Sequence, residues 1–221
     1  MSDTPAQIPR RRLLTAGLGL GTAAALTAVG TGGTASAASV RTTRWAGRTS
    51  ANGWPVVTAP PRIPIEGSGL TVAVTQGAPA SVLLYVARRF HYEIDTLRVG
   101  DVEGHRSDRT IAQAYESNHL SGTALTIRPL LYPVGAAGGL FPNEVVVVRD
   151  ILAECEGMVR WGGDERTPKE SHFHIAVKPG DRRLTALATR IDGWDSRPGQ
   201  GAGAMDAFLP ERRRKAARAT R

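Results

Sequence analysis

The hydrophobic positions between residues 70 and 177 switch repeatedly between spacings typical of strands and of helices. Short runs rich in Val, Ile and Thr predict strands at 70–75, 97–99, 124–127, 158–161 and 172–177. Apolar residues three and four positions apart predict helices that begin near residues 78, 108, 143 and 181. Because these elements mix without strict βαβ alternation, we expect an α+β fold, a single small domain with a central antiparallel sheet and flanking helices.

The segment after Asn143 has two interpretations. Its four consecutive valines, at positions 145–148, are compatible with a buried strand. The polar pair Arg149-Asp150 and Glu154 interrupts the apolar positions at helical spacing and favours a helix.

The first 37 residues have the pattern of a targeting sequence. Arg10, Arg11 and Arg12 precede an apolar run rich in Gly, Ala and Leu, which ends near Ala35-Ser36-Ala37. This order predicts a twin-arginine signal peptide, residues 1–37, cleaved after Ala37. The alternative is a membrane anchor, but a spanning helix needs about 20 strongly apolar residues and this run is shorter and weaker. We therefore expect a protein that is secreted or held in the cell wall, with no transmembrane anchor after cleavage.

Composition suggests three further regions. Residues 38–66 are rich in Ser, Thr, Pro and Gly and predict a flexible lead-in, followed by the folded domain at 67–195. Residues 196–221 end in a basic run and predict a disordered tail. The net charge of +8 favours association with anionic cell-wall polymers, without specific recognition of nucleic acid. We expect a monomer.

Cys155 is the only cysteine, so an internal disulfide framework is excluded. Its spacing from Val148 and Leu152 predicts a small apolar core residue.

Four segments carry the residues best suited to chemistry, and their order is informative. They are Gly104-His105-Arg106-Ser107, the stretch Ser117–Ile127 with His119 and Gly122, Trp161-Gly162-Gly163-Asp164, and His172-Phe173-His174. Together they resemble the M15 family of zinc D-alanyl-D-alanine carboxypeptidases and peptidoglycan endopeptidases. The resemblance implies a hedgehog/D,D-peptidase-like fold and a substrate or ligand among peptidoglycan stem peptides.

The resemblance also implies roles for individual residues. His119 and His172 would be the two histidine ligands of a zinc ion (Zn²⁺), with an open position for the attacking water. Arg106 would polarise the substrate or bind its carboxylate. His174 and Asp164 would support the metal site or compensate for a missing ligand.

Two positions depart from the family pattern. Thr126 stands where the family has its aspartate ligand, and Lys169 stands where it has the catalytic carboxylate. Glu170, one position later, could act as a displaced base. Two functions therefore remain open: a zinc hydrolase of stem peptides that uses Glu170, and a non-catalytic relative in which Arg106 grips a terminal carboxylate. A third possibility is attachment to anionic wall polymers through the basic tail.

Overall fold

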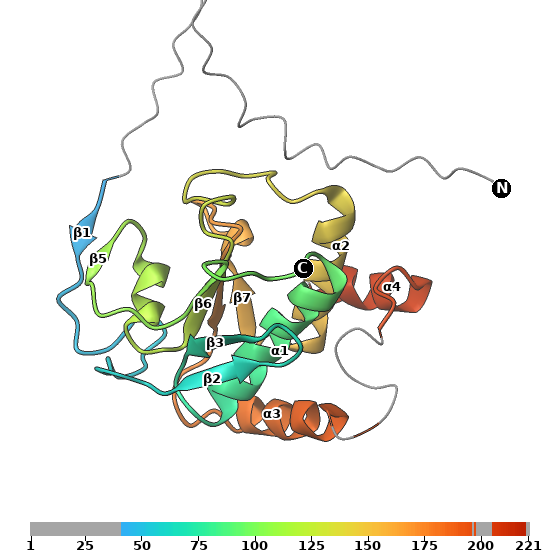
Figure 1. The fold of residues 1–221 in the computed structure, drawn as a ribbon, viewed down its shortest axis with the longest axis horizontal. Coiled ribbons are helices and arrows are strands. Elements are labelled where there is room, and N and C mark those ends of the chain that lie inside the picture. Colours follow the sequence, from blue (N-terminus) through green and yellow to red (C-terminus); the bar gives the residue numbers. More distant parts are fainter. Residues whose placement is uncertain (1–40, 196, 198–204, 220–221) are drawn as a thin grey trace, which may run out of the picture. The chain divides into compact units, whose positions relative to one another are not determined.

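The structure, a computed structural model, describes residues 41–195, 197 and 205–219 (Figure 1). The predicted signal peptide and the start of the predicted tail lie outside the described residues. None of the helices in the described ranges has the length and apolarity needed to cross a bilayer.

A four-stranded antiparallel sheet lies at the centre of the fold (Figure 1). Its strand order is β4(Val102–Glu103), β6(Ala124–Ile127), β8(His172–Ile175), β7(Val159–Trp161). Two smaller antiparallel pairs lie outside it, β1(Thr43–Arg44) with β5(Thr110–Ile111) and β2(Arg62–Ile65) with β3(Leu70–Ala73). The helices are α1(Ala78–Glu93), α2(Pro142–Glu154), α3(Arg182–Asp195) and α4(Pro210–Ala219), with 3-10 turns η2(Ala114–His119) and η3(Gly162–Asp164). The predicted α+β class with antiparallel strands is confirmed.

The register of β6 and β8 separates an apolar face of the sheet from a polar one. Leu125 is paired with Phe173, and both lie in the hydrophobic core that α1 and α2 complete. Thr126 is paired with His172, so these two side chains point to the opposite face. His174, two residues after His172, shares that polar face.

The helices begin where the sequence provides helix-start signals. Gly77, with φ of 81°, precedes α1, and Pro79 lies in its first turn. In α2, Pro142 is the first residue, and the Glu144 carboxylate accepts a hydrogen bond from the backbone N–H of Phe141 at 2.7 Å. The segment with four valines is therefore a helix, and it buries Val147 and Val148.

Two predicted elements are replaced by turns. Residues 97–99 form no strand, because the backbone N–H groups of Leu97 and Arg98 are held by the side chains of His91 and Asp101. No helix begins at Asp108, whose carboxylate accepts the N–H of Thr110 in a tight turn before β5.

The lead-in is bound to the domain, contrary to the expectation of a flexible segment. Ser50 Oγ donates to Ser121 Oγ at 2.8 Å, and Asn52 Nδ2 donates to Thr123 Oγ1 at 2.8 Å. Strands β1 and β2 also pair within the fold. The polar residues that suggested flexibility have specific partners, so the folded domain begins well before residue 67.

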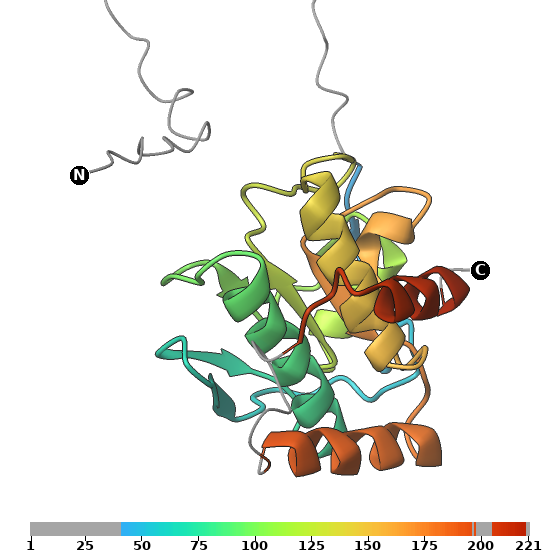
Figure 2. The same ribbon diagram turned by 90° about the vertical axis from the view of Figure 1, so that its right-hand side faces the viewer.

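The basic tail also differs from the prediction of disorder. Residues 210–219 form α4, which packs against α2 (Figure 2). Arg212 and Lys215 form ion pairs with Asp150 and Glu154 of α2, and these contacts offset the like-charge repulsion within the helix.

Candidate functional site

Three histidines from different elements meet on the polar face of the sheet. The ring centroids of His119, at the end of η2, and His172, at the start of β8, are 5.1 Å apart. His174 lies 5.1 Å from His172 by the same measure. We call His119, His172 and His174 the histidine cluster. Tyr115 closes it on one side, 4.9 Å from His172 and stacked on His174.

The orientation of His119 is fixed by a backbone carbonyl. Its Nδ1 lies 2.6 Å from the Gly104 oxygen, an acceptor, so Nδ1 carries the proton and Nε2 of the neutral ring is an acceptor. Only glycine fits at position 104, because a Cβ there would lie 2.2 Å from the Ala73 carbonyl oxygen. The segment that contains Gly104 therefore positions His119, which belongs to the next segment.

Gly162, in the Trp161–Asp164 segment, allows the close packing of the turn before His172. A Cβ at Gly162 would lie 2.4 Å from the Lys169 carbonyl oxygen and 3.0 Å from the Cβ of His172. A side chain at position 162 would thus displace the turn that leads into β8.

All three histidines are held in the neutral form. Burial, followed by the charge of Arg106, lowers the pKa of His119 to about 3. Burial and the charge of Arg160 lower the pKa of His174 to about 4. Burial and the neighbouring His119 and His174 rings bring the pKa of His172 well below its ordinary value.

Several buried polar atoms at this place have no hydrogen-bond partner among the described residues. They are Thr126 Oγ1, Nδ1 and Nε2 of His172, Nδ1 of His174, and Nε and Nη2 of Arg106. Thr126, His172 and His174 are each at most 5% exposed. Buried polar groups are normally paired, so this group of atoms is suited to receive a ligand or ordered water.

Lys169 does not point a free charge at the histidines. Its Nζ donates to Glu116 Oε1 at 2.6 Å, and both side chains are buried. Burial disfavours the Glu116 carboxylate, but the hydrogen bond and charge of Lys169 outweigh it and lower the pKa of Glu116. The second oxygen of Glu116 accepts the N–H groups of Ala112 and Gln113.

The remaining predicted acids are used elsewhere. The Glu170 carboxylate accepts three backbone N–H groups, from Gly138, Gly139 and Leu140, at 2.7 to 3.0 Å. Asp164 forms an ion pair with Arg149 near the surface. Within the described ranges neither acid has a hydrogen bond to the histidine cluster. Glu170 therefore has the contacts of a loop anchor and not those expected of a displaced base, and Asp164 those of an ion pair with Arg149.

Glu116 and Tyr115 were missed by sequence reasoning. Glu116 lies three residues before His119, and a 3-10 turn places such residues on the same side. The three-residue spacing of Glu116 and His119 in the sequence is the feature that could have indicated an acid near the histidine cluster.

A cavity reaches the edge of the histidine cluster at His174. It measures about 370 Å³ and lies beside Tyr115 and His174. Its polar lining residues are Asn52, Gln113, Asn118, Arg160, Glu165, Arg166 and Thr167, in addition to Tyr115 and His174. A second cavity, of about 330 Å³, lies along Gly104–Arg106.

In the part of the chain that the structure describes, no three His, Cys, Asp or Glu side chains are arranged as a metal-binding group. Comparisons with sequence-family models, characterised proteins and solved structures gave no match.

Proposed function

We propose that this chain is an exported cell-wall protein built on a zinc D,D-peptidase (M15) type scaffold, with a cleft that binds a peptidoglycan stem peptide without hydrolysing it. The observation that carries the proposal is the guanidinium of Arg106, which has two unpartnered N–H groups beside the histidine cluster. The four motifs of the resemblance support it, since Gly104 contacts His119, Thr126 pairs with His172, and Gly162 packs against the turn before His172.

The donor set fits a zinc ion poorly. Two imidazoles and the neutral hydroxyl of Thr126 stand where the family has two imidazoles and a carboxylate. The charge of Arg106 acts on both His119 and His172, which disfavours a dication between them. An anion fits better, because the Arg106 guanidinium, the Thr126 hydroxyl and the single N–H of the neutral His172 ring can donate hydrogen bonds.

The proposed ligand is the terminal carboxylate of the stem peptide. Two N–H groups of one guanidinium match the two oxygens of a carboxylate. The hydroxyl of Thr126 and a ring nitrogen of His172 are available for further hydrogen bonds. Among the described residues, the acids considered as general bases have other partners: Glu116 binds Lys169, which stands where the family has its acid, and Glu170 binds residues 138–140.

Calorimetric titration of the purified protein tests this proposal. The ligand is a stem peptide that ends in D-alanyl-D-alanine, compared with the same peptide carrying a terminal amide. We expect binding of the acid, weakened at least tenfold by amidation or by Arg106→Ala. Arg190→Ala is the matched control, because it removes one positive charge in a surface ion pair with Glu156. Equal binding of acid and amide would exclude carboxylate recognition.

A second candidate function is zinc-dependent hydrolysis of the same peptides. One observation favours it: Nδ1 of His119 is bound to a carbonyl, as in many metal-binding histidines, and Nε2 is left to ligate. Stoichiometric zinc that is lost in His119→Ala, together with release of D-alanine, would favour this function over simple binding.

A further inference from the structure

Helix α4 is attached to the domain by two of its five cationic side chains. Arg212 Nη2 donates to Asp150 Oδ2 at 2.7 Å, and Lys215 Nζ donates to Glu154 Oε1 at 2.8 Å. Both acids belong to α2 and are buried, with Asp150 only 1% exposed. The cations are therefore held by acids that the domain itself keeps in place.

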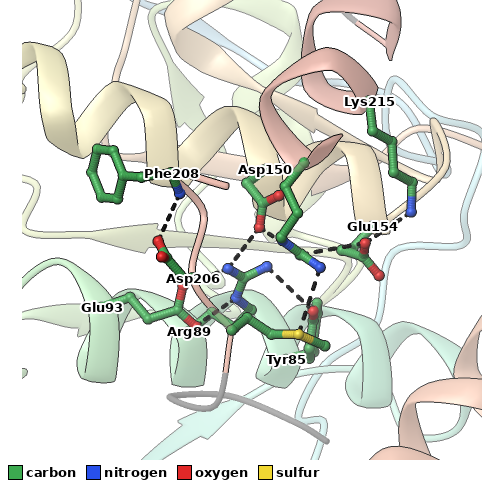
Figure 3. Close-up of polar contacts among 10 residues, drawn as sticks. Tyr85, Arg89, Glu93, Asp150, Glu154, Asp206, Phe208 and Lys215 are labelled. Carbon is green, nitrogen blue, oxygen red and sulfur yellow. Dashed lines mark hydrogen bonds and ion pairs between the residues drawn. The ribbon is translucent and has the colours of Figure 1, made fainter. Parts of the chain in front are cut away.

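The ion pairs continue from α4 into the core, where they fix the position of Asp150. Figure 3 shows Arg89 of α1 between Glu93 and Asp150, with Tyr85 beside it. Arg89 is fully buried and shares the Asp150 carboxylate with Arg212. The turn before α4 is also fixed, because Asp206 accepts the N–H of Phe208 at 2.9 Å (Figure 3).

Helical periodicity divides α4 into two faces. With about 100° per residue, the positions 212, 215, 216 and 219 share the side toward α2. Ala216 is buried on that side. Arg214 and Arg218 lie on the opposite side, and Arg213 lies at its edge, where it lines a pocket with Val145 and Arg149 of α2; all three arginines are exposed. Within residues 41–195 and 205–219, these three arginines have no ion-pair partner.

We propose that this outer face of α4, formed by Arg213, Arg214 and Arg218, is a docking surface for a phosphodiester polymer of the polyol-phosphate type. Guanidinium groups bind phosphate oxygens through paired N–H donors, and a row of them binds a polyanion with release of counterions. Because the helix is held by Arg212 and Lys215, the three arginines are presented together on a fixed surface. This inference is independent of the peptide site.

The composition of α4 favours a polymer without bases over a nucleic acid. Proteins that bind single-stranded nucleic acids combine positive charge with aromatic side chains on which the bases stack. The sequence of α4, Pro-Glu-Arg-Arg-Arg-Lys-Ala-Ala-Arg-Ala, has neither aromatic nor amide side chains. Its arginines can bind the phosphates of a polymer, and α4 lacks the aromatic side chains on which unpaired bases stack.

The test measures the affinity of the full chain for soluble poly(glycerol phosphate) at several salt concentrations. The variant Arg213→Ala/Arg214→Ala/Arg218→Ala removes the outer face. The control Arg182→Ala/Arg183→Ala/Arg190→Ala removes the same charge from exposed positions of α3. We expect the α4 variant to bind at least tenfold more weakly, with a salt slope reduced by about two to three. The control should change affinity less than twofold.

Two results would overturn the proposal. Equal losses in the two triple variants would show that net charge alone determines binding. Tighter binding of single-stranded DNA than of poly(glycerol phosphate), at equal phosphate number, would identify the wrong polymer. Circular dichroism checks folding, and a glutamine triple variant at the same positions repeats the test if the alanine variant unfolds. Binding of the stem peptide should be unchanged in all variants, which separates this surface from the Arg106 site.

Discussion

Lys169 and Glu116 form a buried ion pair, with Nζ and Oε1 2.6 Å apart, beside His119. By the M15 resemblance, Lys169 occupies the position of a catalytic carboxylate. A cation therefore stands where an anion is expected, and Glu116 neutralises it. Glu116 lowers the net positive charge at the site, and Arg106 remains as a cation with unpartnered N–H groups.

The pair predicts a strong coupling between the two positions. Lys169→Met should lower the free energy of unfolding by about 3–5 kcal/mol, because it leaves the Glu116 carboxylate buried without its cation. The double variant Lys169→Met/Glu116→Gln should recover most of this loss. Urea denaturation of the single and double variants measures the coupling, and losses that simply add would show that the two side chains do not interact.

Glu170 is predicted to act on stability and not on ligand binding. Glu170→Ala leaves the N–H groups of Gly138, Gly139 and Leu140 without their acceptor, and should lower the free energy of unfolding by about 3 kcal/mol. Asp164→Ala is the control, since its ion pair is near the surface and its loss should cost less than about 1 kcal/mol. Unfolding and peptide-binding measurements on the same variants check both parts. A Glu170→Ala protein of normal stability that no longer binds peptide would contradict the anchor role.

The buried histidines predict a loss of stability in acid. The pKa of His119 is about 3 and that of His174 about 4 in the folded protein, against 6.5 for an unperturbed histidine. Below pH 6.5 the unfolded chain takes up protons that the folded chain does not, so stability is complete above this pH and falls as the pH decreases toward 4. The slope approaches about 1.4 kcal/mol per pH unit for each histidine, the value for one proton bound only by the unfolded chain. Urea midpoints at pH 7.5, 6 and 5 measure it. His174→Gln should reduce the slope, and a midpoint that is constant over this range would be inconsistent with buried neutral rings.

The ion-pair network under α4 predicts unequal effects of its two arginines. Arg89→Met removes a fully buried guanidinium that pairs with the buried Asp150 and the half-buried Glu93, and should cost about 3–5 kcal/mol. Arg212→Met should cost about 1 kcal/mol, because Asp150 keeps Arg89 and the side chain of Arg212 is partly exposed. Thermal or urea unfolding compares the two. Equal losses would show that α4 is as important to the core as α1.

The pattern of hydrophobic residues predicted the elements that build the core. Leu125 and Phe173 alternate with Thr126 and His172, and the alternation of their side chains follows from strand geometry alone. The four valines of α2 form a helix because the polar positions that follow them repeat at helical spacing.

Partner-specific contacts could not be predicted from composition. Glu116 and Lys169 are 53 positions apart, and Ser50 and Ser121 are 71 apart, so no local window contains both partners. The lead-in, with its Thr and Pro residues, and the Arg-rich tail have the composition of unstructured segments. Their order comes from individual polar partners in the folded domain, such as Glu154 for Lys215.

We propose above that the scaffold is of the zinc D,D-peptidase type and lacks the charges that would hold the metal. Restoring those charges tests it. Thr126→Asp supplies the missing ligand and Lys169→Asp the missing acid. Glu116→Gln must accompany them, because the Glu116 carboxylate would otherwise face a second carboxylate in place of the Lys169 cation.

The most direct measurement is the zinc content of the purified triple variant Thr126→Asp/Lys169→Asp/Glu116→Gln and of the unaltered protein, after dialysis against limiting zinc. We expect about one zinc per chain in the triple variant, lost on further substitution of His119 by Ala, and far less than one in the unaltered protein. A triple variant that folds but retains no zinc, or an unaltered protein that already holds one zinc through His119, would contradict the account.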